Sequence, residues 1–465
     1  MTSTTSRDLT ALRTAMAGAV IDPGHADFDE ARKVWNADID RRPTAIARCT
    51  SAQDVAAAVR FATAAGLEIA VRGGAHSMSG QSTVDDGLVI DLSGMRSVVV
   101  DPEARRVRAE GGAQLADVDA ATQAHGLAIP AGIIGHTGLA GLTLGGGMGW
   151  LTRSFGLTID NMISAEVVLA DGRVVRASAN EHPDLFWALR GGGGNFGVVT
   201  EFEFRCHPVG PMIQFGMFFW GVDQGVEALR FARDLAARLP RELTPKIGAL
   251  NAPPAPFVPE EHQLRPGFVL MIAGFGGPEQ HAAVVEEVRR DCPPLFDFVT
   301  PMPYTGLQQM FDEANCWGQH YYEKSAYIGE ITDDVIDVLV EHLPRKTSPL
   351  SLLLFYRLDQ AYTEVAEDET AFSGGRTPRY GAFTIAAAPV AEMLPAEREW
   401  ARGLVDALRP FTLGNTTYIN GMSEYEEGRV VASYGAAYER LAQIKGAYDP
   451  GNVFHRNANI PPGSP

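Results

Sequence analysis

Two glycine-rich stretches limit what this chain can fold into more than any other feature of its sequence. The first runs from Arg72 to Gly80, and the second runs from Gly132 to Gly149. Because glycine has no Cβ, backbone N–H groups in such loops can converge on an anion and form a concave nest for phosphate oxygens. The pair of loops therefore favours a pyrophosphate ligand, although either loop alone is also compatible with a tight turn.

The two loops match neither of the common nucleotide-binding motifs. No Gly-Lys-Ser/Thr follows either loop, as a Walker loop requires. The Gly145–Gly149 run lacks the strand, helix and acidic residue of a Rossmann fingerprint. The sequence therefore argues against a nicotinamide-dependent dehydrogenase.

Helix and strand patterns alternate around the first loop. Ser51 is a helix N-cap with Asp54 three residues later, and Gly66 is the stop signal of that helix. Residues 67–72 then alternate like a strand that leads into the loop. Further strands are predicted at 88–92, 97–100 and 106–109, and a helix at 115–125.

Residues 166–176 carry the clearest hairpin signal. Asp171-Gly172 separates two apolar runs and predicts a type I′ turn, in which both central residues have positive φ. Such a hairpin argues against a plain βαβ nucleotide-binding domain, so a mixed arrangement of helices and strands is expected.

The glycine-rich pattern thins after Pro208, which predicts a change of domain. A chain of 465 residues is also too long for one ordinary hydrophobic core. Beyond Pro208, the sequence predicts helices at 226–238, 282–290 and 333–343, a strand at 350–356, and a Pro/Ala-rich connection at 251–259.

Charge and cysteine usage exclude several classes of function. With 39 basic and 57 acidic residues the net charge is -18, which repels nucleic-acid phosphates and anionic lipid. No metal-ligand cluster or Cys-x-x-Cys pair appears, so buried free thiols are expected for Cys49, Cys206, Cys292 and Cys316.

The chain has no obvious targeting or membrane segment. Met1–Arg7 lacks the apolar core of a signal peptide, and no apolar stretch reaches the roughly 20 residues of a membrane span. A cytoplasmic protein without nucleic-acid or membrane partners is expected.

A series of segments, in the same order as in a known family, carries a resemblance over nearly the whole chain. With these segments the chain resembles the FAD-linked oxidases of the vanillyl-alcohol oxidase and p-cresol methylhydroxylase (PCMH) superfamily, in the berberine-bridge-enzyme-like branch. The segments are Arg72-Gly-Gly-Ala-His-Ser77, Gly138–Leu151, Gly156–Asn161, Asp184–Thr200 and Tyr448–Ile460.

The resemblance implies an α+β fold. An FAD-binding domain of two α+β subdomains, of the PCMH type, is expected at 1–208 with its core at about 41–210. A substrate domain, with an antiparallel sheet covered by helices that roofs the isoalloxazine, is expected at 209–414. The C-terminal segment 415–465 is expected to return to the FAD domain.

The resemblance also implies how FAD is held. In the family, the histidine of the Arg-Gly-Gly-x-His motif bonds covalently to the flavin 8α-methyl group, and His76 occupies this position. Many relatives add a second bond through a cysteine, which is Ile134 here, so a single covalent bond is expected. The other expected cofactor contacts are Gly73, Gly74, Ala75, Ser77 and Gly80 at the pyrophosphate, Thr137, Gly138, Gly141 and Gly145 in the second loop, Val199, Asn420 and Asn457.

An oxidase is the expected activity. It would transfer a hydride from a phenolic, polyketide-like, alkaloid or sugar substrate to the flavin, with reoxidation by molecular oxygen and release of H₂O₂. Thr137 falls where the family places a small residue on the face of the flavin that meets oxygen. A flavin dehydrogenase with another electron acceptor and a non-catalytic flavin-binding protein remain alternatives, and the chain is expected to be a monomer or homodimer.

The catalytic base does not carry over from the family. Where some relatives have a glutamate on the central strand of the substrate domain, this chain has Leu354, and the usual Gly-Gly after it reads Asp359-Gln360. Phenols and amines with a lowered pKa are the candidates. They are Tyr418, Tyr322 and Lys324, together with Tyr321 and Tyr356.

Overall fold

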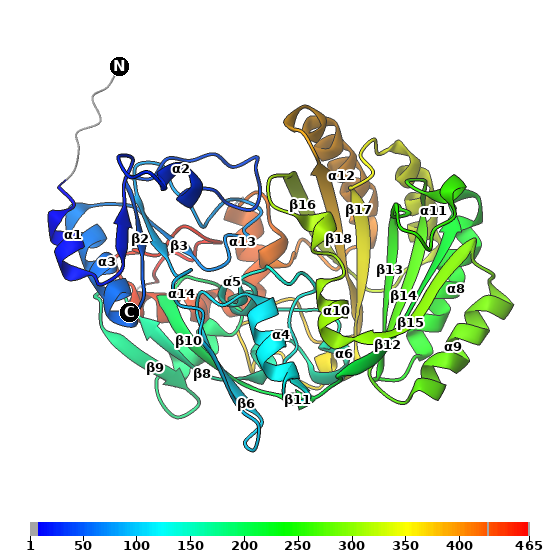
Figure 1. Cartoon of the computed structure of the whole chain (residues 1–465), viewed down its shortest axis with the longest axis horizontal. Coiled ribbons are helices and arrows are strands. Elements are labelled where there is room, and N and C mark those ends of the chain that lie inside the picture. Colours follow the sequence, from blue (N-terminus) through cyan, green and yellow to red (C-terminus); the bar gives the residue numbers. More distant parts are fainter. Residues whose placement is uncertain (1–7, 426, 464–465) are drawn as a thin grey trace.

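The computed structural model describes residues 8–425 and 427–463 as an assembly of two halves (Figure 1). The expectation about a signal peptide at Met1–Arg7 lies outside the described residues. Within those residues, no helix is both long and apolar enough to span a bilayer.

The first half of the chain builds two sheets, which lie on the left of Figure 1. In one sheet β2 and β3 run parallel to β4 between them while β1 is antiparallel to β2, and the other sheet is antiparallel throughout. In sheet order, the strands are β1 (Ala19–Ile21), β2 (Ala45–Arg48), β4 (Leu88–Asp91) and β3 (Ile69–Arg72), then β5 (Val98–Asp101), β6 (Arg106–Glu110), β10 (Val198–Arg205), β8 (Met162–Val168) and β9 (Val174–Ser178), with a separate pair β11 (His207–Pro208) and β7 (Leu127–Ala128).

Helices of this half flank the sheets and the loops that leave them. The predicted first helix is confirmed as α3, because the Ser51 side chain accepts the N–H of Asp54 and Gly66 ends the helix at φ +61°. The helices are α1 (Thr10–Ala15), α2 (Phe28–Ala31), α3 (Ala52–Ala65), α4 (Leu115–Gln123), α5 (Leu139–Leu144), α6 (Thr152–Phe155) and α7 (Pro183–Leu189).

The predicted hairpin is confirmed as β8 and β9, but its turn differs from the prediction. Gly172 has φ +80°, whereas Asp171 is absent from the described residues with positive φ. Leu169 exchanges backbone hydrogen bonds with Gly172 and Arg173, so the loop has three residues and ends in a left-handed glycine. The prediction of a type I′ turn was wrong, because such a turn also requires a positive φ at Asp171.

The second half is built on one seven-stranded antiparallel sheet, on the right of Figure 1. Its strands, in order across the sheet, are β15 (Phe296–Pro303), β12 (Met212–Gly221), β14 (Pro266–Gly274), β13 (Leu243–Asn251), β17 (Leu352–Leu358), β18 (Arg379–Ala388) and β16 (His320–Ile328). This confirms the expected α+β fold with an antiparallel second sheet.

The two faces of this sheet have different partners. One face shares a hydrophobic core with α8 (Gly225–Arg238), α9 (Pro278–Asp291), α11 (Asp333–His342) and α12 (Leu394–Leu408). Residues on the other face, including Met271 and Leu354, pack with α10 (Tyr304–Gln309) and with Trp150 of the first half. This second face is therefore the one that lies against the first half of the chain.

The C-terminal segment returns to the first half. Its helices α13 (Glu427–Tyr434) and α14 (Tyr438–Tyr448) place Tyr434 and Leu441 in the same core as β8 and β10. Lys445 is fully buried and donates to the carbonyl of Asn195 at 2.6 Å, while Asp449 lies 2.6 Å away as its ion-pair partner. The tail is thereby fixed to the glycine-rich turn that precedes β10.

All four cysteines are free. Cys49, Cys206 and Cys292 are buried as expected, but Cys316 is exposed, so the expectation of a buried thiol is wrong at that position.

Candidate functional site

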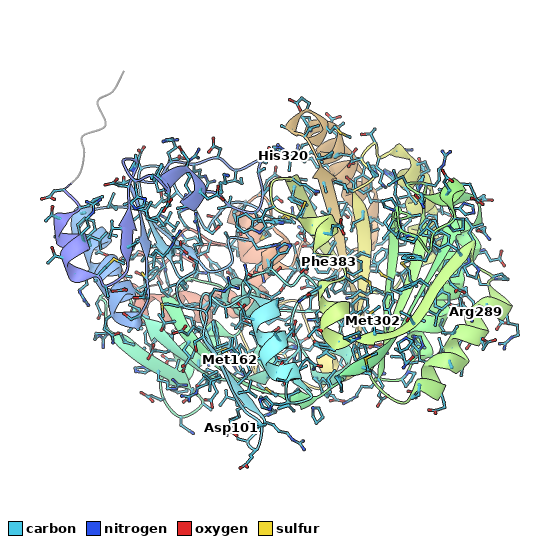
Figure 2. All side chains as sticks on the ribbon, in the orientation of Figure 1. Asp101, Met162, Arg289, Met302, His320 and Phe383 are labelled. Atoms are coloured by element: carbon cyan, nitrogen blue, oxygen red, sulfur yellow. The ribbon has the colours of Figure 1, made fainter. Side chains whose placement is uncertain are left out.

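A cavity of about 420 Å³ lies between the seven-stranded sheet and the loops of the first half. Its walls come from segments far apart in the sequence: the first glycine-rich loop, residues 132–148, the turn before β10, the roof sheet and the C-terminal tail. Phe383, one of the roof residues, is labelled between the two halves in Figure 2.

The two glycine-rich loops meet backbone to backbone at the floor of the cavity. A Cβ added to Gly74 would lie 2.2 Å from the nitrogen of Gly138, and a Cβ on Gly138 would lie 2.2 Å from the nitrogen of Gly74. No side chain fits at either position. By contrast, a Cβ on Gly141 would meet nothing within 4 Å, since this residue borders the open space of the cavity.

His76 lies at the cavity wall between a second histidine and a tryptophan. Its Nε2 is 2.9 Å from Nδ1 of His136, and its ring stacks on Trp35 at a centroid distance of 4.1 Å. Burial, with a smaller contribution from His136, lowers the pKa of His76 to about 3. His76 is therefore a neutral imidazole, and its Nδ1 is the ring nitrogen that the His136 contact does not occupy.

One end of the cavity is formed by β10 and the tail. Val199 and Asn457, both expected to contact the cofactor, line this end, and Asn457 Nδ2 donates to the carbonyls of Gly194 and Phe454. Arg456 also lines the cavity and was missed, although it lies inside the recognised Tyr448–Ile460 segment. Asn457 Oδ1 and Arg456 Nε are buried without a hydrogen-bond partner among the described residues.

Tyr418 and Asn420 lie opposite this end, in the tail segment at η9 (Ile419–Gly421). The Tyr418 hydroxyl oxygen accepts the N–H of Gly147 and the Nδ2–H of Asn420, each at 3.0 Å. Burial raises the pKa of Tyr418 to about 12, although both hydrogen bonds act to lower it. With its oxygen accepting two bonds, the hydroxyl has its own hydrogen left to donate.

The roof of the cavity is mostly apolar. Alternate residues of neighbouring strands point into it, so a single face of the sheet supplies the lining. These residues are Leu250, Met271, Leu352, Leu354, Tyr356, Phe383 and Ile385.

Glu323 is the carboxylate of this roof, and it was missed by the sequence reasoning. It lies on β16 opposite Ile385 of β18 and is buried, and burial raises its pKa to about 8. No local motif identifies Glu323. Its neighbours Tyr322 and Lys324 are also polar, so the sequence shows no alternation that would assign one of the three to the cavity.

The two neighbours of Glu323 do not reach the cavity, which corrects the expectation for Tyr322 and Lys324. Successive side chains of a strand point to opposite faces, and theirs point toward α12. Tyr322 donates to Glu424 at 3.1 Å and accepts from Arg402, while Lys324 Nζ lies 3.5 Å from Glu424.

Three other expected residues also lie outside the cavity wall. Gly80 has φ +71° and contacts Ile39, so it serves a turn. A Cβ on Gly145 would lie 2.2 Å from the Asn420 amide, so this glycine makes room for that side chain. Tyr321 stacks on Trp35 at 3.8 Å, and its hydroxyl lies 2.9 Å from the Cys316 carbonyl.

The remaining expected residues do come together at the cavity. They are Gly73, Gly74, Ala75, His76, Ser77, Thr137, Gly138, Gly141, Val199, Asn420 and Asn457, with Tyr356 and Tyr418 on the opposite side and Ile134 and Leu354 at the two positions where family residues are replaced. A backbone cradle and buried polar atoms without partners, including Ser82 Oγ, match the needs of an elongated cofactor with a diphosphate. The residues present therefore fit FAD.

Two family descriptions match parts of the chain. Residues 43–178 match the FAD binding domain, and residues 417–461 match the description "Berberine and berberine like". These two segments contribute the glycine-rich floor and the tail of the cavity.

Similar proteins extend over the full length. The chain is 31% identical over 452 residues to an FAD-linked oxidoreductase of Dictyostelium discoideum, covering 96% of this chain and 95% of that protein. It is 32% identical over 483 residues to (R)-6-hydroxynicotine oxidase of Paenarthrobacter nicotinovorans, covering 96% and 97%. The crystal structure of 6-hydroxy-D-nicotine oxidase from Arthrobacter nicotinovorans superposes with a TM-score of 0.84 at 28% identity, covering 100% of both chains.

Proposed function

Because this chain belongs to the berberine-bridge-enzyme-like branch of the FAD-linked oxidoreductases, we propose that it is an oxidase that uses covalently bound FAD to oxidise a small organic substrate. The observation that carries the proposal is a cavity in which a glycine-built floor, His76 and the tail face an apolar roof. A cofactor and a substrate can thus lie against each other without water between them.

FAD is held by residues of the floor and the tail. Gly73–Ser77 and Gly138 would hold its diphosphate, and Val199 and Asn457 would lie near its adenosine part. His76 forms the covalent bond to the 8α-methyl group through Nδ1, since His136 engages Nε2. The bond is single, because Ile134 has no thiol to form a second one.

When bound, the flavin supplies the redox chemistry, taking up a hydride with its electron pair and passing two electrons to O₂ to give H₂O₂. The residues of this chain orient the substrate and exclude water. Tyr418 contacts the reacting group from the tail, and Thr137 presents a small side chain that leaves room for O₂ at the cavity wall.

Acid precipitation of the purified protein tests the covalent FAD. We expect yellow colour in the wild-type pellet and in that of His125→Ala, an exposed histidine outside the cavity, but release of flavin from His76→Ala. Complete release from the wild type would refute the covalent bond, and absence of flavin after reconstitution would refute the whole proposal.

Reoxidation of the reduced protein in air separates an oxidase from a flavin dehydrogenase. An oxidase returns to the yellow state rapidly and forms one H₂O₂ for each flavin, whereas slow reoxidation would favour another electron acceptor. A donor panel with peroxide detection then identifies the substrate among phenolic, polyketide-like, alkaloid and sugar compounds. The cytoplasmic location and the monomeric or homodimeric state stay predictions.

A further inference from the structure

We propose that Glu323 is the catalytic base of this site, and that its substrate is a compact, mainly apolar alcohol rather than an oligosaccharide. This inference deepens the proposed oxidase function and rests on it. It starts from the position of one carboxyl group on the roof sheet.

The register of the sheet directs Glu323 into the cavity. On β16 it lies directly opposite Ile385, which lies opposite Leu352 of β17, and all three line the cavity. Gly421 of the tail leaves space for the carboxyl, because a Cβ there would lie 2.5 Å from Glu323 Oε1. The same tail segment carries Tyr418, so carboxyl and phenol border one part of the cavity.

The Glu323 carboxyl has no hydrogen-bond or ion-pair partner in the part of the chain that the structure describes. Its backbone N–H donates to Ser423 Oγ, but its side-chain oxygens remain available to a ligand. Buried carboxyl groups are normally paired. An unpaired one that faces a substrate cavity is therefore a candidate for function.

The groups around Glu323 leave it without a neutralising cation. On the cavity side they are the phenols of Tyr356 on β17 and of Tyr418 and Tyr425 in the tail. Lys324, Arg402 and Glu424 form their own ion pairs on the opposite face of β16. Lys246 is also buried, but it lies on β13, two strands beyond β18, over the ring of Tyr356. His76 and Arg456 belong to the cofactor side of the cavity.

Acidity favours Glu323 over Tyr418 as the proton acceptor. The pKa of Glu323 is about 8 and that of Tyr418 about 12, both raised by burial. At the same pH, a larger fraction of Glu323 than of Tyr418 is therefore ionised. A general base works best when its pKa is close to the working pH.

Tyr418 then has the complementary role of donor. Its oxygen already accepts from Gly147 and Asn420, so it can donate its own hydrogen to the substrate oxygen. The substrate O–H proton moves to the Glu323 carboxylate while the hydrogen of the adjacent C–H leaves with its electron pair to the flavin. A carbonyl forms, the flavin is reduced by two electrons, and Glu323 later returns its proton to water.

The lining around Glu323 defines the substrate class. Leu352, Leu354, Phe383 and Ile385 give the roof beside Glu323 an apolar surface. A sugar would bring a hydroxyl group on nearly every carbon against these residues, where most would lose their hydrogen bonds to water without replacement. A substrate with an apolar carbon skeleton and a single hydroxyl group can pack against these residues while its hydroxyl bonds to Glu323 and Tyr418.

The experiment measures flavin bleaching without oxygen, using 1-phenylethanol, 1-phenylethylamine and cellobiose as donors. We expect 1-phenylethanol to bleach the wild type fastest. Glu323→Gln should lower that rate constant by about 10²–10⁴-fold and remove its rise with pH near 8. Glu424→Gln, which makes the same chemical change on the outer face of the sheet, should leave both unchanged.

Each remaining outcome argues against a specific step. Faster bleaching by cellobiose or the amine would overturn the substrate class, and an unchanged rate in Glu323→Gln would overturn the base. If no donor bleaches the wild type, the oxidase function itself loses its support. Infrared titration of the substrate-free protein then tests Glu323 independently of any donor. The C=O band of its protonated carboxyl group should disappear near pH 8 and should be missing in Glu323→Gln. Absence of that band in the wild type would refute the inference.

Discussion

At the scale of the residue, the absence of single Cβ atoms determines how the cavity floor is built. The two glycine-rich loops approach so closely at Gly74 and Gly138 that a methyl group on either would collide with backbone. Gly141, in the same loop as Gly138, has open space where its Cβ would lie. Gly74 and Gly138 are therefore needed for the fold, whereas Gly141 is needed to keep space for the ligand.

This difference predicts opposite effects of two alanine substitutions. Gly74→Ala should destabilise the flavin-free protein by about 1–3 kcal/mol, because backbone must move to admit the methyl group. Gly141→Ala should leave the stability of the flavin-free protein unchanged but reduce FAD incorporation, because its methyl group enters the cavity. Thermal unfolding and flavin content measure the two effects, and equal destabilisation by both variants would contradict the explanation.

At the scale of the elements, α4 of the first half and α10 of the second half hold the second glycine-rich loop between them. Gln308 Nε2 lies 3.3 Å from Asp119 Oδ2 and donates to the Gly132 carbonyl at 3.0 Å. The Gly135 N–H donates to Asp312 at 2.6 Å. Burial raises the pKa of Asp119 to about 7, so this contact between helices depends on pH.

Asp119→Asn should make the protein less sensitive to pH. A carboxyl whose pKa is higher in the folded than in the unfolded chain contributes full stability below its ordinary value of 3.8, and loses it as pH rises toward 7. The wild type should therefore lose roughly 2–4 kcal/mol relative to Asp119→Asn between pH 4 and 7. Unfolding measured over this pH range tests the prediction, and parallel stability curves would refute it.

At the scale of the whole molecule, buried arginines join the two halves, Arg153 with Asp359 and Arg376 with Asp160. Arg153 of α6 is fully enclosed, pairs with Asp359 after β17 at 2.5 Å, and donates to the Leu239 carbonyl at 2.9 Å. Asp359 also pairs with Arg357 at 2.9 Å, and the next residue, Gln360, adopts a φ of +54°.

Arg153→Met should destabilise the protein by about 3–5 kcal/mol, because the buried Asp359 carboxylate keeps only Arg357 as an ion-pair partner and the Leu239 and Leu243 carbonyls lose their donor. Adding Asp359→Asn should recover part of this loss, so the two effects should not be additive. Arg173→Met, which breaks an exposed ion pair with Asp171, should cost less than about 1 kcal/mol. Thermal unfolding of the wild type, Arg153→Met, Asp359→Asn, their double variant and Arg173→Met makes the comparison, and additive losses would contradict a coupled pair.

Local patterns predicted the local structure well. The helix capped by Ser51, the strand before Arg72 and the hairpin around Gly172 were all found, because capping, alternation and glycine turns act over a few residues. Motifs likewise identified His76, Gly74 and Asn457, which line the same cavity.

The roof of the site could not be predicted in this way. Tyr322, Glu323 and Lys324 are adjacent in the chain, and only the pairing of β16 with β18 decides that Glu323 faces the cavity. The contacts of Gly80 with Ile39 and of Gly145 with Asn420 likewise depend on which segments the fold brings together.

The sequence by itself determined the loops, caps and turns, and through its motifs the family and the cofactor. Tertiary structure decided which carboxyl and which phenol share the substrate space, and that Arg153 closes the junction of the halves. The physical reason is the distance along the chain over which each interaction acts. Backbone preferences are set by neighbours within a few residues, whereas strand register and side-chain burial are set by packing between segments that are separated by up to hundreds of residues.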